Sequence, residues 1–148
     1  MEVNGLGIGR GNSRVKKLVI LFDTNMLLLI ANSINVFEQI EERIDVKPDY
    51  IVLKPIIGEL EKLVKSGKPS ISRKARFALS IVKEYCRIID VDLEYSSIDD
   101  LIIKYAEKNK VVVATCDKKL RRELRKRGLP NIYLREEKMM IETEGLEI

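Results

Sequence analysis

The chain has 148 residues, of which 45% are hydrophobic and 34% charged, and 27 basic against 23 acidic residues give a net charge of +4. This size suits one domain with its own core. No apolar run approaches the ~18 residues of a membrane span, and the N-terminus lacks the apolar core of a signal peptide, so we expect a cytoplasmic protein that makes no membrane contact. The sequence contains no histidine, which excludes Ser-His triads, histidine acid/base catalysis and His-ligated zinc.

Short apolar runs and helical patterns alternate along the chain. Residues 1–14 carry four glycines before the first strand and are expected to form a flexible leader, since a phosphate-binding loop would follow a strand. Strands are predicted at 18–22, 50–53, 86–90, 111–115 and 132–134, and helices at 25–32, 35–44, 55–66, 72–85, 98–108 and 118–127. Residues 66–72 are expected to be a loop between two helices.

This alternation predicts an α/β fold with a parallel sheet of four to five strands and helices on both faces, in three layers. We assign residues 15–135 to this domain. Residues 136–148 are rich in glutamate and are expected to form an acidic C-terminal tail.

Several acids fall where open α/β sheets bind ligands, at the carboxyl ends of strands. Asp23 ends the run LVILF, Glu59 lies one turn into the helix after YIVL, and Asp117 lies two residues past VVVAT. Asp99 and Asp100 open the helix that leads into VVVAT. Asp117 could simply cap its helix, but a carboxylate that ends a buried strand is hard to explain by stability alone.

Helical periodicity separates Asp99 from Asp100. Asp99 lies roughly 80° from the centre of the apolar face of its helix, whereas Asp100 lies almost opposite that face. We therefore take Asp99 as the site candidate and Asp100 as a helix cap. The same test leaves Glu59 and Glu61 open, because each lies about 100° from the centre of its apolar face.

Converging carboxylates repel one another unless a cation neutralises them. Mg²⁺ and Mn²⁺ prefer carboxylate oxygens, and such a site can activate water and neutralise a phosphate. Two basic stretches would attract a phosphodiester, although a charged run can also be a plain solvated face. They contribute Arg73, Lys74, Arg76, Lys118, Lys119, Arg121, Arg122 and Arg125. Aromatic residues are scarce, so we expect base stacking to contribute little.

The order of these residues resembles the PIN-domain family of metal-dependent ribonucleases. The matching stretches are LVILFDTN, GELEKL, IDDLIIKYAEKNKVVVATCDKKL and IYL, which span residues 17–134. The resemblance assigns the family's acids to Asp23, Glu59, Asp99 and Asp117, and so selects Glu59 over Glu61. It also assigns two small polar residues, Asn25 and Thr115, to holding ligands or waters in place.

The resemblance implies an endoribonuclease that needs Mg²⁺ or Mn²⁺ and leaves a 5′-phosphate and a 3′-hydroxyl. Some relatives carry a further acid where this chain has Lys119, so the resemblance leaves open whether one or two metal ions bind. Of two branches, the ribosomal-RNA-processing type is favoured over the VapC toxin type by GELEKL and ATCDKKLRRELRKRG. RNA is the expected partner and a homodimer is implied, with an antitoxin only on the toxin branch.

Two other functions remain open at this point. A PIN-like module could bind RNA or a protein without cleaving. A phosphatase or receiver domain could use Asp23 as a nucleophile, although the phosphatase pattern needs an aspartate where the chain has Asn25.

Overall fold

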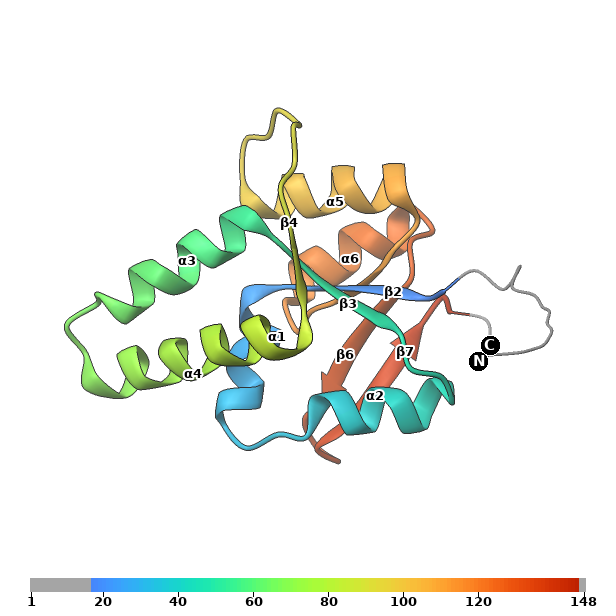
Figure 1. The fold of residues 1–148 in the computed structure, drawn as a ribbon. Coiled ribbons are helices and arrows are strands. Elements are labelled where there is room, and N and C mark those ends of the chain that lie inside the picture. Colours follow the sequence, from blue (N-terminus) through green and yellow to red (C-terminus); the bar gives the residue numbers. More distant parts are fainter. Residues whose placement is uncertain (1–16, 147–148) are drawn as a thin grey trace, which may run out of the picture.

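The computed structural model describes residues 17–146 (Figure 1). The expected leader, residues 1–14, lies outside the described residues. Within them the chain forms a six-stranded sheet in the order β4-β3-β2-β5-β6-β7. The strands are β2 (Val19–Phe22), β3 (Asp49–Leu53), β4 (Arg87–Ile89), β5 (Val112–Ala114), β6 (Asn131–Arg135) and β7 (Met140–Glu144).

Helices connect the parallel strands and cover both faces, as the alternating pattern predicts. They are α1 (Thr24–Ala31), α2 (Val36–Ile44), α3 (Lys54–Val64), α4 (Pro69–Tyr85), α5 (Ile98–Asn109) and α6 (Lys118–Lys126). Figure 1 shows α5 and α6 on one side of the sheet and α1, α2 and α4 on the other. The predicted three-layer α/β fold is therefore confirmed. No helix between residues 17 and 146 combines the length and apolarity needed to cross a bilayer.

The direction of the chain through the sheet reverses next to β2. From β2 the chain proceeds to β3 and β4 on one side, and it then returns to β5 and β6 on the other side of β2. Such a reversal opens a crevice outside the carboxyl ends of the two central strands. The crevice therefore lies at the ends of β2 and β5, where Asp23 and Asp117 follow.

The central strands form a rigid base for this crevice. Ile20, Leu21 and Phe22 of β2 have no exposed surface, and Val113 and Ala114 of β5 are equally buried. Both faces of these strands pack against helices, which explains why their sequences are continuous apolar runs without alternation. A side chain that follows such a strand is held in a fixed position.

The sheet has six strands, one more than the upper limit of the four to five expected. Residues 140–144, within the stretch expected to be an acidic tail, form β7 and pair antiparallel with β6. The glutamates that suggest a solvated tail have partners in the fold, because Glu142 pairs with Arg43 and Glu144 pairs with Arg121.

A side chain of α2 covers the outer edge of β7. The main-chain nitrogen of Ile141 donates to Oε1 of Gln39 over 2.8 Å, and Nε2 of Gln39 donates to the carbonyl oxygen of Met139 over 3.3 Å. The amide of Gln39 thus makes the hydrogen bonds that a neighbouring strand would otherwise make at this position.

Helix α4 begins earlier than expected. The segment 66–72 was expected to be a loop, but α4 starts at Pro69. Proline suits the first turn of a helix because its missing N–H would have no intrahelical acceptor there. Helices α3 and α4 lie side by side (Figure 1).

Candidate active site at the carboxyl edge of the sheet

Four acids from four separate elements line one pocket at the crevice. Asp23 follows β2, Glu59 lies on α3, Asp99 lies in the first turn of α5, and Asp117 precedes α6. The fold thus brings together residues up to 94 positions apart, 23 and 117, in the way that the placement of acids after strands predicts.

The carboxylates share this pocket without converging on a single point. Among residues 17–146, no group of three or more Asp, Glu, Cys or His side chains has the spacing of a formed metal site. A cation would therefore have to draw the side chains together when it binds.

Asp23 is held more firmly than any of the other three acids. Its Oδ1 accepts the Thr24 main-chain N–H over 2.8 Å, and its Oδ2 accepts the Thr115 hydroxyl over 2.8 Å. Its residue surface is only 6% exposed. Burial raises the pKa of Asp23 to about 6, the two hydrogen bonds oppose that rise, and the charges of Asp99 and Glu59 add to it.

Thr115 and Asn25 connect the two strand ends that form the crevice. The fully buried Thr115 hydroxyl donates to Asp23 and accepts the main-chain N–H of Asp117 over 3.1 Å. The side-chain oxygen of Asn25 accepts the main-chain N–H of Cys116 over 3.1 Å. These bonds fix the start of α1 against the segment between β5 and α6, and with it the spacing of Asp23 and Asp117.

Thr24 contacts a second acid that sequence reasoning did not connect with it. Its hydroxyl donates to Oε1 of Glu59 over 2.5 Å. Glu59 is half-buried and lines the pocket, whereas Glu61 is exposed on α3. The structure therefore distinguishes these two glutamates where periodicity leaves them equal. The sequence contained little indication of the bond between Thr24 and Glu59, since it showed only that a hydroxyl residue follows Asp23.

Of Asp99 and Asp100, only Asp99 lines the acid pocket, although both line a neighbouring depression with Lys119. Asp99 lines the acid pocket, and its pKa is raised by burial first and then by the charge of Asp117. Oδ2 of Asp100 accepts the Ser96 main-chain N–H over 3.0 Å and pairs with Lys104. Asp100 therefore caps and stabilises the start of α5.

Asp117 is both a helix cap and a member of the pocket. Its Oδ1 accepts the main-chain N–H groups of Lys119 and Leu120 over 2.9 and 3.1 Å. The structural role that the sequence suggests is thus confirmed. These two bonds use Oδ1 only, and Asp117 also lines the pocket together with Asp99.

The donor set fits a hard divalent cation. It consists of carboxylate oxygens, and within residues 17–146 the hydrogen bonds of Glu59 and Asp117 involve only one oxygen of each. Like charges across the pocket raise the pKa of both Asp23 and Asp99, and a bound cation would offset this repulsion.

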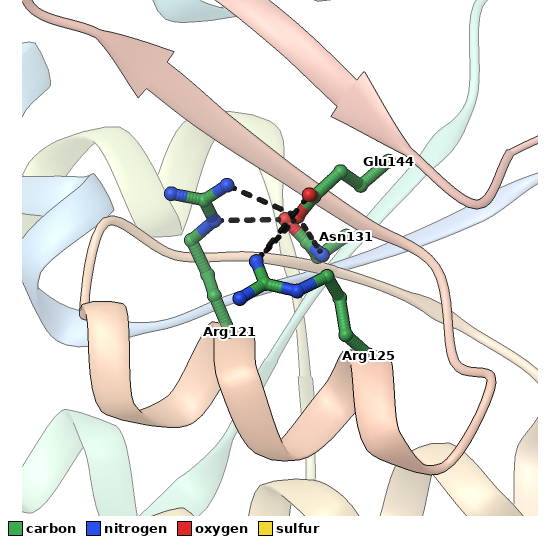
Figure 2. Close-up of polar contacts among 4 residues, drawn as sticks. All are labelled: Arg121, Arg125, Asn131 and Glu144. Carbon is green, nitrogen blue, oxygen red and sulfur yellow. Dashed lines mark hydrogen bonds and ion pairs between the residues drawn. The ribbon is translucent and has the colours of Figure 1, made fainter.

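Two of the arginines expected to contact RNA pair with a carboxylate of the protein (Figure 2). Oε1 of Glu144 accepts hydrogen bonds from Arg121 over 3.0 Å, from Arg125 over 3.3 Å and from Nδ2 of Asn131 over 3.0 Å. The side chain of Arg121 is 15% exposed and lies 3.4 Å from the centre of the Tyr133 ring. Arg121 and Arg125 therefore fasten β7 to α6.

The other basic candidates are differently placed. Lys118, Lys119 and Arg122 are exposed on α6, and Lys119 lines a depression with Glu59 and Asp99. Arg73, Lys74 and Arg76 line a separate pocket on α4. Sequence reasoning missed Lys62, which lies one helical turn after Glu59 and lines the acid pocket. The spacing of three residues on a helix was the available signal.

Fold and pocket together define a class: three-layer α/β proteins that hold a cluster of carboxylates at the topological switch point of a mostly parallel sheet. Comparison with known proteins narrows this class. The family model described as PIN like domain matches residues 19–137. The chain belongs to the PIN-like domain family.

Relatives and a solved structure agree with this assignment. The chain is 34% identical over 122 residues to Ribonuclease VapC4 of Methanocaldococcus jannaschii, a match that covers 78% of the chain and 89% of the relative. It is 32% identical over 128 residues to Ribonuclease VapC9 of Archaeoglobus fulgidus, covering 86% and 89%. The structure of the PIN domain endonuclease Utp24 superimposes with a TM-score of 0.70 at 27% identity, covering 86% of this chain and 92% of that one.

Proposed function

We propose that this chain is an endoribonuclease that depends on a divalent cation held by Asp23, Glu59, Asp99 and Asp117. The observation that carries the proposal is that these four carboxylates, from four separate elements, line one pocket at the switch point of the sheet. The names of the relatives support it, because two are ribonucleases and the superimposable structure is an endonuclease.

When bound, Mg²⁺ or Mn²⁺ supplies Lewis-acid chemistry and an activated water for attack on a phosphodiester. The chain's own residues position the ligands for it. Thr115 and the Thr24 main chain fix the two oxygens of Asp23, and the Thr24 hydroxyl orients Glu59. Cleavage in this manner leaves a 5′-phosphate and a 3′-hydroxyl.

Cations near the pocket bind the phosphates on either side of the cleaved bond. Lys62 lines the acid pocket and Lys119 lines the neighbouring depression, so each lies beside the carboxylates. Further along α6, Lys118 and Arg122 are exposed to solvent. Charge-assisted hydrogen bonds from such side chains to phosphate oxygens give affinity without reading sequence.

The biological role follows one of two branches. The motifs favour an enzyme of ribosomal-RNA processing, whereas the VapC names of both curated relatives favour the toxin type. Expression of the chain and of Asp23→Asn in a growing host separates the two. Growth arrest by the wild type alone supports the toxin type, and unimpaired growth with cuts in precursor ribosomal RNA supports processing.

The nuclease itself is tested by cleavage of an end-labelled structured RNA with Mn²⁺, with Mg²⁺ and with EDTA. We expect cleavage only with metal, and a loss of about 100-fold in Asp99→Asn and in Glu59→Gln. The chain offers a matched control for each variant, Asp100→Asn and Glu61→Gln, because these neighbours carry the same charge outside the acid pocket. Cleavage that survives EDTA, or that falls equally in the controls, would contradict the proposal.

A further inference from the structure

Another pocket lies on α4, beyond the far end of α1 from the acids. Its volume of about 590 Å³ is within the range of small-ligand sites. It is lined by Ala31, Ser70, Arg73, Lys74, Arg76 and Phe77. The pocket thus combines three cations with one aromatic ring.

The spacing along α4 places most of these side chains on one face. Ser70, Arg73, Lys74 and Phe77 recur at intervals of three and four residues, which is the spacing of neighbours on a helix surface. Ala75 and Ala78 are buried against the rest of the protein. The face that carries the cations and the ring is therefore turned away from the core.

The cations of this pocket have no acidic partner in the described part of the chain. Between residues 17 and 146, no carboxylate lies within 4 Å of Arg73, Lys74 or Arg76, whereas Arg121 and Arg125 of α6 both pair with Glu144. Unpaired cations gathered in one pocket favour an anionic ligand.

The ring in this pocket is also exposed. Phe77 is 49% exposed, on a helix whose other face packs against the core. An exposed aromatic ring among cations is the composition of surfaces that bind single-stranded nucleic acid. There the bases stack on aromatic side chains, and the cations bind the backbone.

We propose that this pocket binds an unpaired nucleotide of the RNA substrate, with its base stacked on Phe77 and the adjoining phosphates on Arg73, Lys74 and Arg76. The identity of the ligand rests on the proposed function. The overall scarcity of aromatic residues led us to expect little stacking. One exposed ring is sufficient for one base, because every base has a flat π-face.

Helix α1 connects the pocket with the acids and sets their separation. Asp23 caps the start of α1 and Ala31 ends it in the pocket. Eight helical residues span ~12 Å at 1.5 Å each. With ~3.4 Å per stacked nucleotide, this corresponds to roughly three to four nucleotides. The substrate is therefore an RNA with an unpaired nucleotide at about that distance from the cut.

The test measures binding of a fluorescently labelled single-stranded 20-mer RNA and of a duplex of the same length, by anisotropy, with EDTA present to prevent cleavage. We expect Phe77→Ala to weaken single-strand binding about tenfold, Phe77→Trp to restore it, and the duplex affinity to stay unchanged. Tyr95→Ala is the matched control, because Tyr95 is likewise 43% exposed but lies outside the pocket.

The outcomes separate this inference from the proposed function. Unchanged single-strand affinity in Phe77→Ala, in a chain that cleaves RNA, overturns the stacking site and leaves the nuclease intact. An equal loss for single strand and duplex overturns the preference for an unpaired nucleotide. A wild type that neither binds nor cleaves RNA overturns both. Urea unfolding of each variant establishes that a loss of binding is not a loss of fold.

Discussion

Asp23 is a buried carboxylate at the end of a strand of apolar residues. Burial disfavours the ionised form of this side chain and raises its pKa from an ordinary 3.8 to about 6. The ionised Asp23 therefore lowers the stability of the folded protein. Between these values the folded chain binds a proton that the unfolded chain releases. The free energy of unfolding therefore falls as the pH rises from about 4 to 6, and it stays lower above pH 6.

Asparagine at position 23 removes this titration. In EDTA above pH 6.5 we expect Asp23→Asn to raise the free energy of unfolding by about 1–2 kcal/mol, with part of the electrostatic gain cancelled by a weaker bond to Thr115. The gain should vanish below about pH 3, where the aspartate is protonated in both the folded and the unfolded state. Urea unfolding at several pH values measures this. A variant less stable than the wild type at pH 7.5 would contradict this expectation.

Single residues were predictable from the sequence where a local rule applied. Strand ends located Asp23 and Asp117, and helical periodicity separated Asp99 from Asp100. The choice of Glu59 over Glu61 needed the family resemblance, because both flank the apolar face at equal angles. The bond from Thr24 to Glu59 joins residues 35 positions apart, and periodicity carries no information about such pairs.

At the scale of elements, β7 is attached to the domain by a cluster of ionic hydrogen bonds (Figure 2). Glu144 accepts from Asn131, which is fully buried, and from Arg121 and Arg125. These donors lower the pKa of Glu144, with Asn131 as the largest cause. Without the carboxylate, buried donors on β6 and α6 would lose their acceptor.

We expect Glu144→Ala to lower the free energy of unfolding by about 2 kcal/mol at pH 7, because it leaves Nδ2 of the buried Asn131 without its acceptor and the guanidinium of Arg121 without an anionic partner. Glu137→Ala is the control, since Glu137 has an 82% exposed side chain and its pairing with Arg135 contributes little. Chemical denaturation of both variants gives the comparison. Equal stabilities would mean that the cluster does not hold β7.

The elements themselves were largely predictable, and their errors have physical causes. Apolar runs identified the buried strands β2, β3 and β5, whose two covered faces leave little room for polar residues. The strand β7 was not predicted, because its glutamates are typical of a solvated tail. Their partners on α2 and α6 become known only from the structure. The start of α4 was predicted too late in the chain, because Pro69 was assigned to a loop and not to the first turn of the helix.

At the scale of the whole molecule, the acids tie four elements to one pocket, so a cation bound there stabilises the fold as a unit. A ligand that binds only the folded state, at 100 times its dissociation constant, adds about 2.7 kcal/mol to the free energy of unfolding. We expect Mn²⁺ to raise the midpoint of thermal unfolding at pH 7.5 in the wild type and in Asp100→Asn, but not in Asp99→Asn. An equal rise in all three would place the cation elsewhere.

The side chain of Gln39 has a consequence for how copies of this protein can meet. By bonding to the main chain of Met139 and Ile141, it occupies the edge of β7 at which a strand from another molecule would add. Growth of the sheet from one molecule into the next is thus prevented at this position. At the opposite edge, β4 offers only three residues, Arg87–Ile89. Both edges of the sheet thus carry a feature that disfavours the addition of a strand from another molecule.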